Sequence, residues 1–141
     1  MKKEKKILPH DENRLYSDRR DDLYTNLEKI FGALGLAMKA GGLAVGTEAV
    51  TLAVSKEKAR IVFLTEDISE NSKDKLMSKL YAFGTKYIIL PCSMALLASR
   101  LGKTGFTTSA ALTRPGFEKI IFKCMEEISA VKSHDNTTEV Q

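Results

Sequence analysis

The strongest indication of the fold comes from residues 39–51, Lys39-Ala-Gly-Gly-Leu-Ala-Val-Gly-Thr-Glu-Ala-Val-Thr51. The glycines of this stretch end one helix and, after a short strand, place the start of another helix at the surface beside a lysine. The N-terminus of a helix offers free backbone N–H groups and a positive dipole, which suit a phosphate. A second stretch, Arg60 to Asp67, has the apolar run of a buried strand and ends in two carboxylates. Together they predict one binding face on an α/β sandwich.

Apolar periodicity extends this pattern toward both termini. Large apolar residues recur every three or four positions over residues 23–38, which predicts one amphipathic helix stopped by Gly41-Gly42. A strand over residues 43–45 follows, and then a helix that Thr47 caps. The apolar run over residues 61–64 predicts a central strand covered on both faces.

The rest of the chain continues to alternate helices and strands. The predicted elements, in order, are a helix capped by Ser69, with Phe83 facing inward, and closed by Gly84; a strand over 87–90; a helix capped by Ser93; a weaker strand over 106–112; and a last helix from about residue 114, with Ile120 facing inward. This alternation implies βαβ units, and therefore an α/β fold in which helices cover both faces of a mixed or parallel sheet.

Length and composition favour one domain. At 141 residues and 43% hydrophobic side chains, the chain can bury a core. Residues 1–20 mix both charges without apolar periodicity and are expected to form a disordered tail. The domain is expected over residues 21–132, and a polar tail over 133–141. We find no run of about 18 apolar residues and no apolar signal region, so a cytoplasmic protein without membrane contact is expected.

Charge and the scarce cysteines and histidines narrow the chemistry. Most of the positive excess lies between residues 31 and 123, which favours a polyanion such as nucleic acid as partner. Cys92 and Cys124 belong to no metal-binding or disulfide pattern, so we expect both in the core. His10 and His134 lie in the predicted tails, which argues against metal binding and histidine catalysis.

Two features allow more than one interpretation. The glycines at positions 41, 42 and 46 can bind a phosphate or simply end helices and form tight turns. Glu66-Asp67 can hold Mg²⁺ or act as acid and base, but Asp67 and Glu70 can equally serve as the cap and first-turn charge of the next helix. Among the aromatic residues, Phe106 and Tyr81 are the candidates for exposed stacking surfaces.

The order of these elements resembles a known family. With Lys39, Gly41, Gly46-Thr47, Val50-Thr51, Glu66-Asp67 and Ser69-Glu70-Asn71, the chain resembles the kink-turn-binding ribosomal protein family (L-seven-Ae type) over about residues 31–123, nearest to its bacterial YlxQ-like branch. The resemblance implies a three-layer α/β/α sandwich with a small mixed sheet. It also implies a non-enzymatic, monomeric RNA-binding protein without a cofactor. Its expected partners are structured, kink-turn-like RNA linked to the ribosome, and ribosomal proteins.

The resemblance also assigns site residues. It implies that Gly46 and Thr47 place backbone N–H groups on phosphate or base, that Glu66 and Asp67 border the site, and that the loop from Lys103 covers it. The full set of predicted RNA-binding residues is Lys39, Gly46, Thr47, Glu48, Thr51, Glu66, Asp67, Ile68 and Lys103.

The sequence departs from the family pattern at the start of this helix. Kink-turn readers carry Gly-x-Asn-Glu with a lysine four residues after the Asn, whereas this chain has Glu48, Ala49 and Leu52 at these three places. A glutamate only accepts hydrogen bonds and repels phosphate. A protein-interaction module on the same fold is therefore the alternative hypothesis. An exposed Leu52 would favour it, and a buried Leu52 would favour RNA binding.

Overall fold

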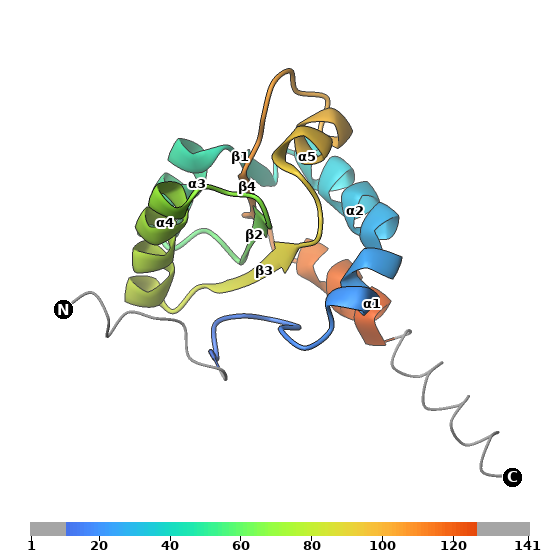
Figure 1. Ribbon diagram of the computed structural model, residues 1–141, viewed down its shortest axis with the longest axis horizontal. Coiled ribbons are helices and arrows are strands. Elements are labelled where there is room, and N and C mark those ends of the chain that lie inside the picture. The colour runs from blue at the N-terminus through green and yellow to red at the C-terminus, as the bar shows by residue number, and fades with distance from the viewer. Residues whose placement is uncertain (1–10, 127–141) are drawn as a thin grey trace, which may run out of the picture.

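The structure is a computed structural model that describes residues 11–126 (Figure 1). A further helix occupies residues 117–126. The named elements are α1 (Arg20–Thr25), α2 (Leu27–Lys39), β1 (Leu43–Val45), α3 (Thr47–Ser55), β2 (Ile61–Thr65), α4 (Glu70–Phe83), β3 (Lys86–Leu90), α5 (Met94–Arg100) and β4 (Ser109–Leu112). Among the described residues, no helix is long and apolar enough to cross a membrane.

One four-stranded mixed sheet, in the order β1-β4-β2-β3, forms the centre of the protein. β4 pairs antiparallel with both β1 and β2, whereas β2 and β3 are parallel. Every residue of β2 is buried, as its unbroken apolar run predicts. The prediction of an α/β fold with a small mixed sheet is confirmed.

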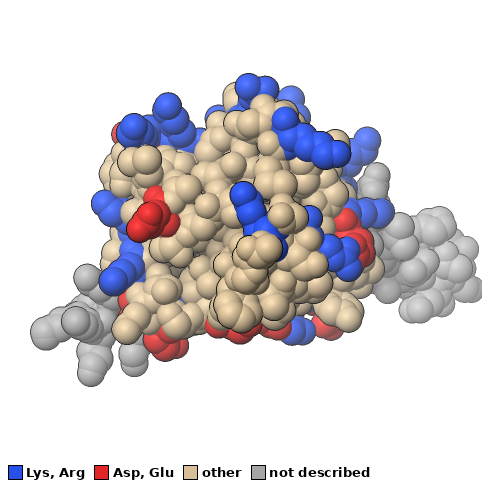
Figure 2. All heavy atoms as spheres, turned by 90° about the horizontal axis from the view of Figure 1, so that it is seen from above, with Lys and Arg blue, Asp and Glu red and all other residues tan. Residues whose placement is uncertain are grey.

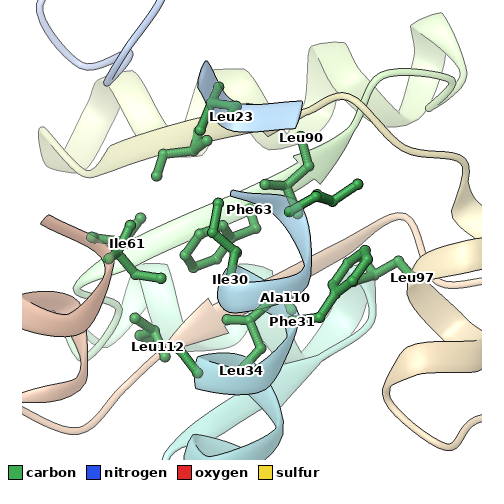
Figure 3. Packing of buried hydrophobic residues seen from close by; sticks show 14 of the residues in the cluster. Leu23, Ile30, Phe31, Leu34, Ile61, Phe63, Leu90, Leu97, Ala110 and Leu112 are labelled. Atoms are coloured by element: carbon green, nitrogen blue, oxygen red, sulfur yellow. The ribbon is translucent and has the colours of Figure 1, made fainter. Parts of the chain in front are cut away.

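Helices cover the sheet on both faces and enclose two cores (Figure 1). α1, α2, α5 and the helix over 117–126 pack on one face, where side chains from α2 meet Ile61, Phe63 and Leu112 of the sheet (Figure 3). α3 and α4 pack on the other face, over Val62 and Leu64. Because neighbouring residues of a strand point to opposite faces, β2 supplies both cores in turn. The result is the predicted three-layer sandwich.

Glycine and serine end and begin the helices as predicted. Gly41 has φ +75°, and the N–H of Gly42 bonds to the carbonyl of Ala37 at 2.7 Å, which closes the C-terminus of α2. The Ser69 hydroxyl accepts a hydrogen bond from the N–H of Ser72 at 3.2 Å and caps α4. Gly84, with φ 63°, closes that helix in the left-handed conformation.

The helix predicted from residue 23 is wrong in its continuity, because the chain breaks at Asn26 into α1 and α2. Asn26 is 2% exposed, and both its backbone N–H and its side-chain amide donate to the carbonyl of Asp22. A side-chain amide that bonds the backbone in this way competes with helix continuation. Periodicity alone does not register this competition.

Three further predictions are corrected by the structure. Thr47 does not cap α3, because Gly46 is the N-cap residue and Thr47 already lies in the helix. Phe83 and Ile120 are 41% and 38% exposed, since helical periodicity assigns residues at the edge of an apolar stripe only approximately. The weaker strand begins at Ser109 and not at Phe106, because Phe106 is exposed in the loop and the N–H of Thr107 donates to the carbonyl of Met94 and not to a neighbouring strand.

Residues 11–19, which belong to the predicted disordered tail, lie along the outer edge of β3 (Figure 1). Tyr87 donates its N–H to the carbonyl of Asn13 at 2.8 Å, and its carbonyl accepts from the N–H of Leu15 at 2.7 Å. The carboxylate of Asp11 accepts hydrogen bonds from the hydroxyls of Tyr81 and Tyr87, at 2.6 and 2.5 Å. Backbone pairing, which charge composition does not reveal, places this segment. His10 and His134 lie outside the described residues.

Candidate nucleic-acid interface

Four loops meet at one end of the sheet. The N–H of Gly46, after β1, donates to the carbonyl of Ser109 at 2.9 Å, and the N–H of Thr65, at the end of β2, donates to the carbonyl of Thr108 at 3.0 Å. The N–H of Thr107 donates to the carbonyl of Met94, which follows β3, also at 3.0 Å. We call the surface formed by residues 46–52, 66–68, 93–94 and 103–108 the loop face.

The start of α3 offers free hydrogen-bond donors on the loop face. α3 has no side-chain cap, and the N–H groups of Thr47, Glu48 and Ala49 have no acceptor among residues 11–126. The Thr47 hydroxyl is turned to that of Thr108, with 3.2 Å between the oxygens. The N–H of Gly46, which the family resemblance assigns to a phosphate, is occupied within the sheet. The free donors therefore begin one residue later than predicted.

Gly46 nevertheless shapes this helix start. Its φ of +98° and ψ of 155° form a combination that only glycine adopts readily. A Cβ added to Gly46 would have no other atom within 4 Å, so space alone does not require the glycine. The backbone turn from β1 into α3 requires it.

The carboxylates after β2 are engaged in structural contacts. Asp67 accepts from the N–H of Met94, at 3.0 and 3.2 Å, and so ties the end of β2 to the start of α5. Glu66 forms an ion pair with Arg20 of α1, with a closest N···O distance of 3.0 Å. Among the described residues, no group of three metal-ligating side chains is present. The two carboxylates therefore connect elements of the fold, and the first-turn acid of α4 is Glu70.

The loop after α5, residues 103–108, contributes an exposed segment to the loop face. Gly102 and Gly105 have φ values of +70° and +82°, which a side chain would oppose. Buried Thr107 anchors the loop, whereas residues 103–106 are exposed. Phe106 is 72% exposed and Lys103 lies in the same exposed run. Of the two predicted stacking candidates, Phe106 is free, while Tyr81 holds Asp11.

Of the other predicted residues, Glu48, Thr51 and Ile68 belong to the loop face, whereas Lys39 does not. Glu48 is exposed in the first turn of α3, and half-buried Thr51 lies in the same helix; half-buried Ile68 packs against the core under α3 and α4. Lys39 is exposed in the last turn of α2, before the start of β1, whereas Gly46 follows its end. The structure thus separates Lys39 from the loop face by the length of β1.

Leu52 is exposed, with 55% of its surface accessible. It lies on α3, one turn after Glu48. An apolar side chain at this position cannot contact a phosphate as a lysine would, and it suits a protein surface. This observation favours the alternative hypothesis of a protein-interaction module.

Cys92 lies beneath the loop face and is 4% exposed. Burial, together with the nearby charges of Asp67 and Glu66, raises the pKa of its thiol to about 12. A thiol with so high a pKa is a poor nucleophile. Cys92 and Cys124 are free, buried cysteines, as the sequence predicts.

Two residues that contribute to the loop face were missed by sequence reasoning. Arg20 was assigned to the tail, and its partner Glu66 is 46 positions away. Thr108 orients Thr47 from a distance of 61 positions. No local pattern signals either pair.

Seen from above, the protein shows Lys and Arg around much of its margin and near its middle, with acidic side chains toward the edges (Figure 2).

The chain is similar to known proteins in sequence and in fold. A sequence model of the ribosomal protein L7Ae/L30e/S12e/Gadd45 family matches residues 28–122. The RNA-binding protein YlxQ of Enterococcus faecium is 38% identical over 82 residues, which span 55% of this chain and 75% of that protein.

Two solved structures share the fold. A Bacillus halodurans protein of unknown function has a TM-score of 0.60 and 24% identity, over 70% of this chain and 97% of that chain. A 15.5 kD RNA-binding protein of Giardia lamblia has a TM-score of 0.58 and 13% identity, over 77% of this chain and 88% of that chain.

Proposed function

Because the chain belongs to the ribosomal protein L7Ae/L30e/S12e/Gadd45 family, we propose that it is a non-enzymatic RNA-binding protein that uses the loop face. Its target is structured, kink-turn-like RNA associated with the ribosome, and ribosomal proteins are its expected neighbours there. The protein acts as a cytoplasmic monomer. The similar proteins of Enterococcus faecium and Giardia lamblia both carry the name of RNA-binding proteins, which supports this proposal.

The observation that carries the proposal is the uncapped start of α3. Three consecutive N–H groups, those of Thr47, Glu48 and Ala49, lack acceptors among the described residues and lie beside the loop that contains Lys103. Backbone donors at a helix N-terminus bind phosphate oxygens with the help of the helix dipole. The side chain of Glu48 opposes such an anion, so the affinity depends on contacts from more than one loop.

A binding role fits the carboxylates better than a catalytic role. Asp67 is bound to the N–H of Met94, and Glu66 is paired with Arg20, so both carboxylates already make structural contacts. Isothermal titration calorimetry with Mg²⁺ tests this part of the proposal. Binding of Mg²⁺ that Glu66→Gln and Asp67→Asn abolish would support a catalytic site instead.

Fluorescence anisotropy tests RNA binding directly. The protein is titrated against a kink-turn RNA, a straight duplex and a structured ribosomal RNA fragment, each at about 50 and 200 mM salt, because phosphate contacts weaken over this range. The expected result is that the kink-turn or the ribosomal fragment binds more tightly than the duplex. Equal, weak and salt-sensitive binding to all three would reduce the interaction to non-specific charge attraction.

A matched pair of variants locates the site. Lys103→Ala removes a charge from the loop face, whereas Lys58→Ala removes one from the turn before β2, at the other end of the sheet. Lys103→Ala is expected to weaken RNA binding several-fold, by the loss of about one phosphate contact. Lys58→Ala is expected to change it by less than about twofold, because it makes no such contact. Equal effects of both variants would contradict binding at the loop face.

The exposure of Leu52 supports a second candidate function, a protein-interaction module on the same fold. In that case α3 contacts an apolar protein surface in place of RNA. Leu52→Ala would then weaken capture of ribosomal proteins in a pull-down with purified ribosomal subunits, and the protein would bind none of the three RNAs with preference. Retained capture by Leu52→Ala would contradict this candidate.

A further inference from the structure

α1 lies outside the part of the chain that the family model matches, yet it reaches the loop face. The match begins at residue 28, whereas α1 spans Arg20–Thr25. Arg20, the first residue of α1, forms an ion pair with Glu66, which directly follows β2. An element that the family match does not include thus supplies a cation to the face proposed to bind RNA.

The position of α1 is fixed by contacts on its other side. Leu23 is 2% exposed in the core formed with α2 and the sheet. The guanidinium of Arg19 donates to the carbonyl of Met125 at 2.8 Å and pairs with Asp22 at 2.9 Å. Because these neighbours hold the backbone of α1, they place Arg20 within reach of Glu66.

The pairing of Arg20 with Glu66 leaves room for a third group. Two nitrogens of the Arg20 guanidinium lie 3.0 to 3.3 Å from Glu66. The two side chains are 62% and 42% exposed, so water reaches both. A guanidinium has five N–H donors, and a carboxylate does not use all of them. The remaining donors can bind a phosphate while the ion pair stays in place.

The loop face carries negative charge that opposes RNA binding, so a cation at this place would strengthen it. Three carboxylates there, those of Glu48, Glu66 and Asp67, repel an RNA backbone. The Met94 N–H partly compensates Asp67, and Arg20 neutralises Glu66. The exposed carboxylates of Asp18 and Asp21 repel phosphate. Any attraction of α1 for RNA therefore comes from Arg20, the one cation of this helix.

We propose that Arg20 is an RNA-binding residue of this protein, which binds a phosphate of the RNA while it remains paired with Glu66. This inference rests on the proposed function. It extends the interface beyond the matched family region to α1.

The test measures RNA affinity at several salt concentrations for the full chain and four variants, one of which is the charge-restoring Arg20→Lys. Arg20→Gln removes the charge at similar size. Glu66→Gln removes the carboxylate and frees the guanidinium. Arg60→Gln is the matched control, because Arg60 also forms an ion pair with a glutamate, Glu118, but precedes β2, at the opposite end of that strand. Thermal unfolding checks that each variant is folded.

The inference predicts one lost phosphate contact in Arg20→Gln. The slope of log affinity against log salt should fall by about 0.7 to 0.9, so that the loss of affinity between about 50 and 200 mM salt shrinks about threefold. Arg20→Lys should restore the slope, because it restores the charge. Glu66→Gln should bind as tightly as the unmodified chain or more tightly, and Arg60→Gln should bind within about twofold of it, because it loses no phosphate contact.

The outcomes separate this inference from the proposed function. If the unmodified chain binds RNA and Arg20→Gln binds with the same affinity and slope, the ion pair is structural only and the inference is wrong. If Arg60→Gln lowers the slope as much as Arg20→Gln, net charge explains the effect and the inference is also wrong. If the unmodified chain binds none of the RNAs, the proposed function and the inference fail together.

Discussion

Glu57 has the backbone conformation of a glycine. It directly follows the C-cap of α3 with φ 58°, and its N–H bonds to the carbonyl of Val54 at 2.9 Å. The left-handed conformation costs a residue with a side chain roughly 1–2 kcal/mol, and the entropy that glycine loses on folding offsets about half of this. Glu57→Gly should therefore stabilise the protein by about 0.5–1 kcal/mol, as measured by urea unfolding.

Gly84 provides the control for that substitution. It closes α4 with a similar φ of 63°, and a Cβ added there would have no other atom within 4 Å, so only the backbone opposes a side chain. Gly84→Ala should destabilise the protein by about 1 kcal/mol. A destabilised Glu57→Gly variant would show that the Glu57 side chain makes a contact that outweighs its backbone conformation.

Asp11 connects protonation to stability. Partial burial opposes its charge, but hydrogen bonds from Tyr81, Tyr87 and the N–H of Asn13 outweigh burial and hold the pKa of the carboxyl below its ordinary value of 3.8. A lowered folded-state pKa contributes stability above the ordinary value, and this contribution is lost as the pH falls through the folded-state pKa. Asp11→Asn should remove about 1–2 kcal/mol at neutral pH and flatten the acid dependence of unfolding.

Urea unfolding from about pH 2 to about pH 6, a range that spans carboxyl titration, measures the stability at acid pH. At alkaline pH the stability depends on Tyr81, because burial and the hydrogen bond to Asp11 raise the pKa of its hydroxyl to about 12. Because a raised pKa favours the neutral hydroxyl in the folded state, stability should fall as the pH rises above about 10, the ordinary pKa of tyrosine, toward the folded-state value. An acid profile of Asp11→Asn that parallels that of the unmodified chain would contradict the assignment.

The residues before α1 cover one edge of the sheet. β3 is an edge strand, and its Tyr87 pairs with Asn13 and Leu15 through two backbone hydrogen bonds. An uncovered edge strand can pair with another copy of itself. A chain that begins at Ser17 should lose about 2–4 kcal/mol of stability, from the lost hydrogen bonds and apolar contacts. It should also associate at high concentration.

Sedimentation velocity at several concentrations measures this association. The full chain should sediment as one species, and the shortened chain should shift toward dimers as its concentration rises. Asp11→Asn serves as the intermediate case, because it loosens the segment without removing it. A shortened chain that stays monomeric at all concentrations would show that the edge of β3 resists pairing by itself.

Local sequence patterns predict only part of this fold. The buried strand Ile61–Thr65, the Ser69 cap and the Gly84 terminus were predictable, because each depends on residues close in the chain. The break at Asn26 was not, although its partner Asp22 is only four positions away, because apolar periodicity does not reveal a side chain that bonds the backbone. The occupied N–H of Gly46 was not, because its acceptor, Ser109, lies in the distant strand β4. Arg20 was missed for a related reason, because its partner lies in a distant loop.

The proposed interface combines free backbone donors, cations and one exposed apolar side chain. Leu52 is 55% exposed on α3, so a charge can replace it at a cost of less than about 0.5 kcal/mol. If RNA lies along α3, Leu52→Lys adds about one phosphate contact. For this variant, the slope of log affinity against log salt should become steeper by about 0.9, and the affinity for RNA at about 50 mM salt should rise several-fold.

Phe83→Lys is the control that distinguishes a local phosphate contact at α3 from a general effect of net charge on RNA binding. Phe83 is 41% exposed and ends α4, just before the chain enters β3 from the end of the sheet opposite the loop face. Both substitutions raise the net charge by the same amount, so they alter long-range attraction to RNA similarly. Only Leu52→Lys should steepen the salt dependence. Equal changes would place the RNA elsewhere, and weaker binding by Leu52→Lys would mean that α3 contacts its partner through the apolar side chain.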